Sequence, residues 1–179
     1  TVVLDEAFIE FATREDVASG LEFLDRFPGL VVLRTFSKLY GLAGLRVGYG
    51  FASERIADVY NRVRQPFNVS RLAQAAAQAA LADEDFVQRS LRLVREGLDY
   101  LSPELADLGL TCVPTQTNFF LIRVPGGGKT VYEQMLKLGV IVRAMDSFGL
   151  PDYIRINVGR PEENERFVRS LRQVLAAMP

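Results

Sequence analysis

The chain has 179 residues, of which 49% are hydrophobic and 24% are charged, so it can bury a substantial core. Its formal net charge of −1 gives no general attraction to nucleic acid or to an anionic membrane, and neither is expected as a partner. No apolar run approaches the roughly 20 residues that span a bilayer, and no charged-then-apolar leader is visible in these residues. We therefore expect a cytoplasmic protein.

Histidine is absent from the chain. This excludes a Ser-His-Asp triad, a Cys-His dyad and a histidine-based zinc site within these residues, and we expect no metal site. The sole cysteine, Cys112, lies in an apolar segment and is expected to be a buried packing residue. Acid and base chemistry must therefore fall to lysine, carboxylates or tyrosine.

The first half of the chain alternates between apolar strands and helical segments. Strands are predicted at residues 1–4, 30–34 and 47–52, with an irregular or helical stretch over 16–27. Apolar runs such as 47–51 are typical of strands covered on both faces, and strands separated by helical crossovers indicate a mostly parallel sheet.

Three helical segments follow. The first is predicted to begin with Ser53 as N-cap and Glu54 beside the positive end of the helix dipole, and to end before Gln65-Pro66. The alanine-rich residues 70–81 and the charged stretch 83–101 favour further helices. We place a domain boundary in this helical region near residues 80–90, which gives domains 1–85 and 86–179.

The remainder predicts a smaller α/β unit. Its strand candidates are 111–113, 119–124, 141–143 and 153–158, and its helix candidates are 130–138 and 161–178. The run from Gly126 to Thr130 looks like the tail of a phosphate-binding loop, but that motif requires a glycine where this chain has Arg123. A flexible turn is the better interpretation.

Chemically useful side chains follow the second predicted strand. Thr35, Ser37 and Lys38 come directly after it, and Arg46 stands eight residues beyond Lys38. A lysine can form a Schiff base with an aldehyde, and hydroxyl and guanidinium groups can bind a phosphate ester. These are the two functional ends of pyridoxal phosphate. Asp5, at the end of the first strand, could pair with the protonated pyridine nitrogen of the same cofactor.

Simpler interpretations remain open for these residues. Lys38 could be a surface lysine in a loop, although a charged amine would be costly in the small, apolar neighbourhood that follows it. Arg46, between two apolar residues, could pair with a buried carboxylate. Asp5 could cap a turn.

Five segments keep the order and spacing of motifs in one enzyme family, and these segments are 3–11, 34–48, 61–70, 117–119 and 153–159. On these motifs the chain resembles the pyridoxal-phosphate aminotransferases of fold type I, with histidinol-phosphate aminotransferases as the closest subgroup. The resemblance covers the second half of such an enzyme. It implies the second half of the large, mostly parallel-sheet domain and a small C-terminal α/β domain.

The resemblance also implies an activity and partners. The first expectation is transamination between histidinol phosphate and 2-oxoglutarate in histidine biosynthesis, by a homodimer that binds an amino-acid-derived substrate and a 2-oxo acid. The alternatives are an aromatic amino-acid aminotransferase, a phosphothreonine decarboxylase-like enzyme and, from another class, a non-catalytic fragment or binding module. Residues 1–179 alone are expected to be inactive.

Three residues of the second half are candidates for binding substrate. Arg155 alternates with two isoleucines, so it projects from the opposite strand face, and the resemblance implies that it binds the substrate α-carboxylate. Arg143 corresponds to a family arginine near the distal end of the substrate, where it could grip a phosphate. Asn118 could hydrogen-bond the substrate.

These candidates also have simpler interpretations. Arg155 could form a surface ion pair with Glu162 or Asp152, Arg143 could be a plain surface residue, and Asn118 could merely shape the start of its strand. One residue departs from the family pattern, because Phe8 stands where many relatives carry a tyrosine whose hydroxyl bonds the phenolic oxygen of the cofactor.

Overall fold

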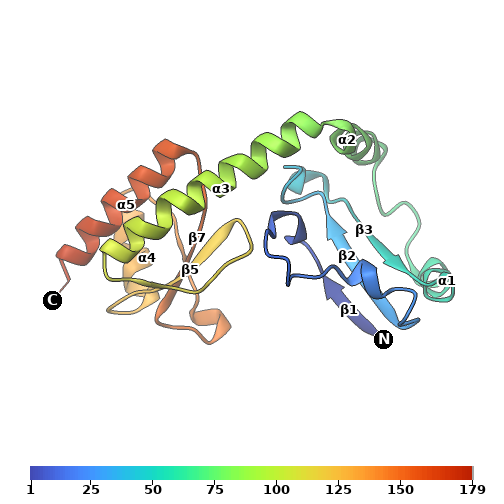
Figure 1. Cartoon of the computed structure of the whole chain (residues 1–179), viewed down its shortest axis with the longest axis horizontal. Coiled ribbons are helices and arrows are strands. Elements are labelled where there is room, and N and C mark those ends of the chain that lie inside the picture. Colours follow the sequence, from blue (N-terminus) through green and yellow to red (C-terminus); the bar gives the residue numbers. More distant parts are fainter. Residues whose placement is uncertain (179) are drawn as a thin grey trace. The chain divides into compact units, whose positions relative to one another are not determined.

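The computed structural model describes residues 1–178 (Figure 1). The chain forms two compact units, Thr1–Ser90 and Leu91–Pro179. The first unit contains β1 (Val2–Asp5), η1 (Ile9–Phe11), η2 (Gly20–Phe23), β2 (Leu30–Thr35), η3 (Ala43–Leu45), β3 (Gly48–Ala52), α1 (Glu54–Val63) and α2 (Arg71–Ala82). Helix α3 (Glu84–Asp107) contains both the predicted boundary at residue 85 and the boundary between the two units.

The first unit holds a three-stranded sheet in the order β1-β2-β3. Strands β1 and β2 are parallel, with Asp5 opposite Leu33, whereas β3 runs antiparallel to β2, with Gly48 opposite Thr35. The sequence pattern indicated a mostly parallel sheet without giving the direction of this strand. A parallel neighbour needs a long crossover, usually a helix. Only a short turn after Thr35 and η3 separate β2 from β3, so the chain reverses direction.

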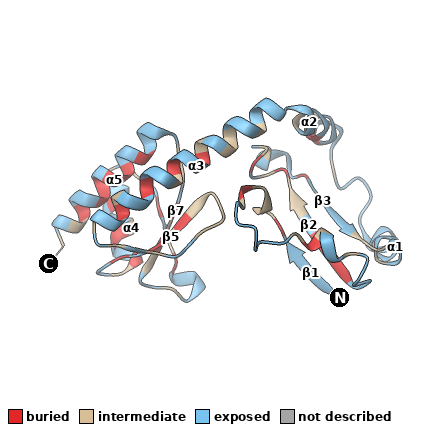
Figure 2. Ribbon diagram, viewed as in Figure 1, coloured by how far each residue is buried: buried red, intermediate tan, exposed pale blue. Residues whose placement is uncertain are grey.

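The faces of this sheet are only partly covered within the described residues, as the pale β1 and β3 of Figure 2 show. Val31 and Val32 of β2 are buried, but Val2 is 60% exposed and Phe51 is 37% exposed. The prediction that residues 47–51 are covered on both faces is therefore wrong for this structure. The apolar composition was read correctly, but the layers that would cover both faces are not among the described elements.

Helices α1 and α2 both follow a serine, but the two serines act differently. Ser70 accepts a hydrogen bond from the Ala73 N–H at 3.2 Å, as an N-cap does. Ser53 occupies the N-cap position of α1 without a capping bond, and its hydroxyl donates to the Pro28 carbonyl at 3.0 Å. The predicted capping role of Ser53 is therefore wrong, although the helix begins where expected.

The second unit packs helices on one face of an antiparallel sheet ordered β4-β5-β7-β6. Its elements are β4 (Thr111–Cys112), β5 (Phe119–Arg123), α4 (Gly128–Lys137), β6 (Arg143–Ala144), η4 (Asp146–Phe148), β7 (Tyr153–Asn157) and α5 (Pro161–Ala176). Buried and less buried residues alternate along β5 and β7. Ile154 and Ile156 join the core with Leu101 of α3 and Leu171 of α5. Cys112 packs against this core, and burial raises the pKa of its thiol.

The glycines before α4 form a tight turn rather than a flexible one. Gly126 and Gly127 have φ values of +70° and +89°, which only glycine adopts at little cost. A Cβ atom on Gly128 would lie 2.1 Å from the Tyr153 carbonyl oxygen. The prediction of a turn is confirmed, but close packing against β7 replaces the flexibility that was expected.

Two absences concern function, and both hold for residues 1–178. None of the helices combines the length and apolar character needed to cross a membrane. Within the same range, no three His, Cys, Asp or Glu side chains gather in a way that could hold a metal ion.

Candidate functional site

Lys38 is carried by a rigid turn directly after β2. The Gly41 N–H donates to the Lys38 carbonyl at 3.0 Å, and the Leu42 N–H donates to the Phe36 carbonyl at 2.9 Å. Phe36 and Leu39, on either side of the lysine, are 4% and 3% exposed. Lys38 itself is exposed, so the argument that its charge would be costly in an apolar neighbourhood is wrong. The buried neighbours fix the backbone while the amine remains accessible.

The turn brings Lys38 to the segment that follows Asp5. The Lys38 Nζ lies 5.1 Å from the centroid of the Phe8 ring, within the range of a cation–π contact. Asp5 is exposed, and its Oδ1 accepts a hydrogen bond from the Ala7 N–H at 3.0 Å. One carboxylate oxygen of Asp5 thus caps a turn, as the simpler interpretation proposed. Two motifs that are separated in sequence meet at the ends of β1 and β2.

The hydroxyl and guanidinium candidates lie on the same loop. The Thr35 Oγ1 accepts a hydrogen bond from the Ser37 N–H at 3.0 Å, which fixes the start of the turn. Arg46 is exposed, with φ at +53°, and its Nη1 donates to the Ala43 carbonyl at 2.6 Å. The alternative of a buried carboxylate partner for Arg46 is therefore wrong. A non-glycine residue in this left-handed region is strained, as is common at functional sites.

A partly buried ion pair, missed in the sequence, lies beside these residues. Arg34 donates to the Glu6 Oε2 from Nε at 3.1 Å and from Nη2 at 3.0 Å. Burial lowers the pKa of Arg34, but the hydrogen bond and charge of Glu6 outweigh it, so the pKa is raised above its ordinary value. The sequence held one sign of this pair, because an acidic and a basic residue follow the apolar runs of the two strands that pair with each other.

In the second unit, the structure sets Arg143 and Arg155 opposite each other on the neighbouring strands β6 and β7. The Arg155 guanidinium lies 4.9 Å from the Phe119 ring centroid, and that of Arg143 lies 4.9 Å from the Phe148 ring centroid. Arg143 opens its strand instead of closing the predicted strand 141–143, because residues 141 and 142 lie outside the ladder that β6 forms with β7. Like charges in register repel unless an anion lies between or above them.

Unpaired polar atoms mark the same part of the second unit. Within residues 1–178, the buried Nε of Arg155 and the buried Oδ1 of Asn118 have no hydrogen-bond partner. Such atoms are costly to bury, so each calls for a ligand or another explanation. Both had been singled out as candidates for binding substrate.

The surface ion pairs considered for Arg155 are formed by other arginines. Asp152 pairs with Arg123 at 3.9 Å, and Glu162 pairs with Arg160 at 3.4 Å. Neither carboxylate pairs with Arg155, whose side chain lies on the sheet face opposite Ile154 and Ile156. A cavity of about 570 Å³ is lined by both Arg143 and Arg155.

Comparison with known proteins identifies the family. The model for aminotransferase class I and II matches residues 1–171. The chain belongs to this family. It is 49% identical over 175 residues to histidinol-phosphate aminotransferase 2 of Pseudomonas fluorescens (strain Pf0-1), covering 98% of this chain and 47% of that protein. It thus spans about half the length of the curated relatives it matches.

Solved structures confirm the expected type I fold. A crystal structure of histidinol-phosphate aminotransferase from Sinorhizobium meliloti in complex with pyridoxal-5'-phosphate has a TM-score of 0.87 at 30% identity, covering 99% of this chain and 49% of that one. The L-threonine-O-3-phosphate decarboxylase from Porphyromonas gingivalis has a TM-score of 0.82 at 28% identity, covering 97% and 55%. The fold is therefore shared by enzymes of different reaction type.

Proposed function

We propose that the full-length protein is a pyridoxal-phosphate-dependent aminotransferase whose amino donor is histidinol phosphate and whose acceptor is 2-oxoglutarate. The relative at 49% identity carries that name, and the side chains of the first unit suit the cofactor. They supply an accessible amine at Lys38, hydroxyl and guanidinium donors at Ser37 and Arg46, and a carboxylate at Asp5. When bound, pyridoxal phosphate supplies an electron sink that stabilises negative charge on the substrate Cα.

Each residue of the first unit then has a defined task. Lys38 would hold pyridoxal phosphate through its amine, and the same amine would serve as general acid and base for the proton on the substrate Cα. Asp5 would accept a hydrogen bond from the pyridine nitrogen and so favour its protonated form. Ser37, Thr35 and Arg46 would bind the phosphate ester of the cofactor.

The pair of arginines on β6 and β7 carries the substrate assignment. Histidinol phosphate has no carboxylate, and its phosphate ester occupies the place of the α-carboxylate of glutamate. One guanidinium must therefore bind a phosphate in one half-reaction and a carboxylate in the other, and Arg155 suits both because its planar fork matches either anion. Arg143, in register beside it, would bind the distal carboxylate of 2-oxoglutarate in place of the phosphate considered for it in the sequence. The unpaired Oδ1 of Asn118 would accept a hydrogen bond from the amino donor.

Two other reactions fit the same fold. An aromatic amino-acid aminotransferase needs room for an apolar ring in the substrate pocket, and a phosphothreonine decarboxylase needs a substrate carboxylate that leaves as carbon dioxide. The structural match to a decarboxylase supports the decarboxylase alternative. The identity to histidinol-phosphate aminotransferases, higher than that to the decarboxylase, favours transamination.

A steady-state assay of the full-length protein against a panel of amino donors tests the proposal. With 2-oxoglutarate as acceptor, histidinol phosphate is expected to give the highest kcat/KM, ahead of phenylalanine and tyrosine. The variant Arg155→Gln should lose about tenfold or more in kcat/KM, because a hydrogen bond to a charged group contributes roughly 1.5–3 kcal/mol. Arg123→Gln, on the neighbouring strand β5, serves as the matched control. A preference for aromatic donors, or carbon dioxide release from phosphothreonine, would remove the assignment.

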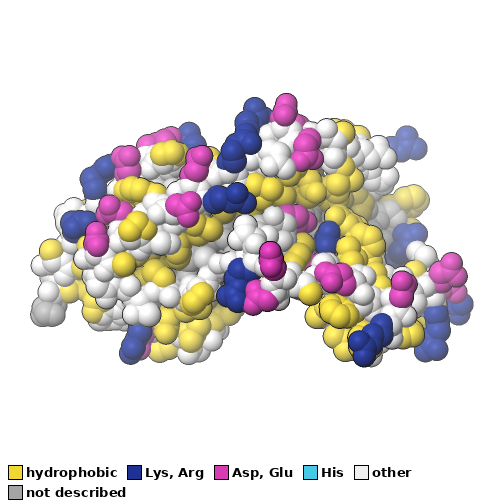
Figure 3. Space-filling model, in the orientation of Figure 1, with side chains coloured by type: hydrophobic (Ala, Val, Ile, Leu, Met, Phe, Trp, Pro, Cys, Tyr) yellow, Lys and Arg dark blue, Asp and Glu magenta, His cyan; other side chains and the backbone are white. Residues whose placement is uncertain are grey.

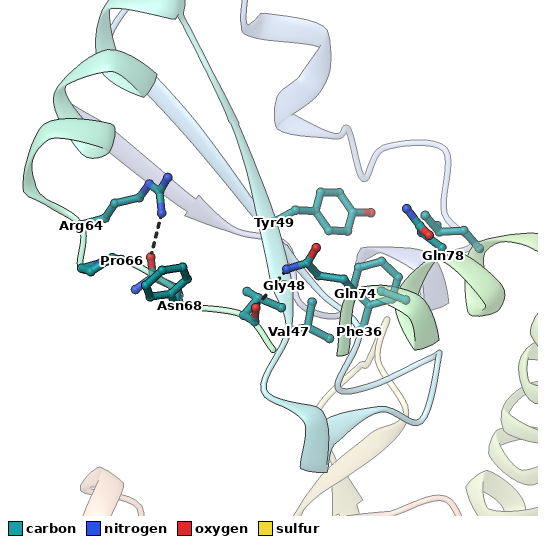
Figure 4. A pocket seen from close by; sticks show the side chains of 13 residues that line it. Phe36, Val47, Gly48, Tyr49, Arg64, Pro66, Asn68, Gln74 and Gln78 are labelled. Atoms are coloured by element: carbon teal, nitrogen blue, oxygen red, sulfur yellow. Dashed lines mark hydrogen bonds between the residues drawn. The ribbon is translucent and has the colours of Figure 1, made fainter. Parts of the chain in front are cut away.

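We also propose that the enzyme is a homodimer located in the cytoplasm. An open groove of about 1010 Å³ in the first unit includes Phe36 and Val47, which border the Lys38 turn, and Gln74 of α2 (Figure 4). At its rim Phe67 is 96% exposed with φ at +62°, a strained backbone that presents an apolar ring. A second copy of the chain would cover this groove. The charged substrates proposed above do not cross membranes unaided, which supports the cytoplasm.

Two measurements test these assignments. Light scattering of the full-length protein should give the mass of a dimer, and Phe67→Asp should raise the dimer dissociation constant, whereas Phe148→Asp, an exposed ring in the second unit, should not. Cell fractionation should recover the activity with cytoplasmic markers. A monomer with full activity would contradict the dimer.

A further inference from the structure

We infer that Glu6, Arg34 and Ser19 form a clasp that sets the spacing between Asp5 and the Lys38 turn, and that these three are positioning residues for the reaction. The inference rests on the proposed function, because it concerns the placement of residues that would hold pyridoxal phosphate.

The clasp joins the ends of the two strands that carry the reactive groups. Asp5 pairs in register with Leu33, and the Glu6 N–H continues the ladder by donating to the Leu33 carbonyl at 2.9 Å. Glu6 directly follows Asp5, and Arg34 directly precedes Thr35 at the start of the Lys38 turn. Each residue of the ion pair is thus the direct chain neighbour of a residue proposed to bind the cofactor.

Side-chain direction keeps the clasp away from the reacting atoms. Successive side chains of a strand point to opposite faces, so Glu6 and Arg34 share one face while Asp5 and Thr35 share the other. The clasp therefore acts from behind the site. It can fix where Asp5 and Lys38 lie without contacting the cofactor, which distinguishes it from the catalytic residues.

The hydrogen bonds of the clasp leave it little freedom. The Ser19 hydroxyl donates to the Glu6 carboxylate, with 3.1 Å to each oxygen, and accepts from the Arg34 Nη2 at 3.0 Å. The Gly20 N–H donates to the Glu6 Oε1. The side chains of Arg34 and Glu6 are 19% and 8% exposed, so solvent competes weakly with these bonds.

The approach of the loop to the sheet also depends on glycine. A Cβ atom on Gly20 would lie 2.7 Å from the Leu4 Cδ1 and 2.8 Å from the Val32 Cγ2, so a larger residue would crowd the approach of this N–H to Glu6. The loop packs on both strands at once and contacts the pair that joins them. The loop of Ser19 and Gly20 thereby holds the Glu6–Arg34 pair in place at the ends of β1 and β2.

Stability alone is a weak explanation for such a pair. Replacing a buried ion pair by apolar residues of similar volume is often neutral or stabilising, so an apolar contact could hold these strands together. The Arg34 guanidinium also fixes the relative orientation of the two strand ends. It donates twice to one Glu6 oxygen and once to Ser19, and these three contacts together define a single geometry. A misplacement of about 1 Å can cost roughly 100-fold in rate, which makes that geometry valuable here.

The test uses the full-length holoenzyme and the variants Glu6→Gln, Arg34→Lys and Ser19→Ala. Visible circular dichroism per bound cofactor reports the orientation of the ring in its site, and steady-state kinetics separates kcat from KM. Glu6→Gln and Arg34→Lys are expected to lower kcat by about tenfold or more, to change KM by less than about twofold, and to reduce the visible signal. The milder Ser19→Ala should show the same pattern to a smaller degree.

The control is the exposed ion pair of Arg62 and Asp58 on α1, where Asp58→Asn should change none of these quantities. If Glu6→Gln does not fold, Arg34→Lys and Ser19→Ala decide the question with the same readouts. Variants that lose thermal stability but keep kcat and the visible signal would show a purely structural clasp and overturn the inference. A wild-type protein that binds no cofactor would instead refute the proposed function.

Discussion

At the scale of single residues, Lys38 combines an accessible amine with a backbone held by two buried neighbours. If the amine joins the cofactor, Lys38→Ala removes both that bond and the group that moves the proton. We predict loss of the visible absorption band of the bound cofactor and a fall in kcat of at least about 100-fold, the lower end for general acid–base catalysis. Spectroscopy and an assay of the full-length protein measure both, with Lys137→Ala in α4 as control. Full transamination by the alanine variant would remove Lys38 from the mechanism.

Arg46 allows its backbone and its side chain to be tested separately. Its φ of +53° costs a non-glycine residue roughly 1–2 kcal/mol, which glycine avoids. We predict that Arg46→Gly and Arg46→Ala both weaken cofactor binding by about tenfold or more, through loss of a charged hydrogen bond. The glycine variant should be the more stable of the two by about 1 kcal/mol. Fluorescence titration and denaturant unfolding check this, and unchanged cofactor affinity in both would exclude a phosphate-binding role.

Phe8 departs from the family pattern in a way that spectroscopy can follow. The Lys38 amine lies near its ring, but the ring offers no hydroxyl to the phenolic oxygen of the cofactor. In Phe8→Tyr a new hydrogen bond would stabilise negative charge on that oxygen. We therefore predict that the midpoint of the pH-dependent colour change of the bound cofactor moves to lower pH. An unchanged midpoint in a variant that still binds cofactor would place Phe8 away from that oxygen.

At the scale of elements, the sequence predicted most strands and helices, and it failed where a partner decides the outcome. Periodicity alone places Ile154 and Ile156 in a core and Arg155 on the other face. It does not reveal that β3 pairs antiparallel, because direction depends on the connection, or that Ser53 bonds Pro28 instead of its own helix. The Glu6–Arg34 pair was missed for the same reason, since its partners are distant in sequence.

Gly128 connects two elements whose contact can be tested. A Cβ atom at this position would lie 2.1 Å from the backbone carbonyl of Tyr153 in β7, the strand that carries Arg155. Backbone atoms relax poorly, so Gly128→Ala should lower the free energy of unfolding by about 1–3 kcal/mol, as overpacking does. Gly44→Ala, with no atom within 4 Å of the added Cβ, should change it by less than about 0.5 kcal/mol. Equal effects in denaturant unfolding would contradict the packing argument.

At the scale of the whole molecule, the two units differ in how completely they enclose their apolar residues. The second unit buries a continuous core between its sheet and helices, whereas the first leaves much of its apolar sheet exposed. The sequence indicated the layers of both units but could not show which faces remain open within these residues. Apolar side chains at the surface are visible in the space-filling view of Figure 3.

This difference predicts the behaviour of residues 1–179 expressed alone. Val2, Val3 and Leu33 are 60%, 51% and 40% exposed, and β1 lies at the edge of its sheet. Exposed apolar faces and unpaired strand edges promote association. We predict that the isolated span elutes larger than a monomer, binds an apolar dye and binds pyridoxal phosphate poorly. Val3→Lys should reduce the dye signal, whereas Ile141→Lys, at an exposed apolar residue of the other unit, should change it less. A monomeric, cofactor-binding preparation of this span would show that the first unit needs no further covering.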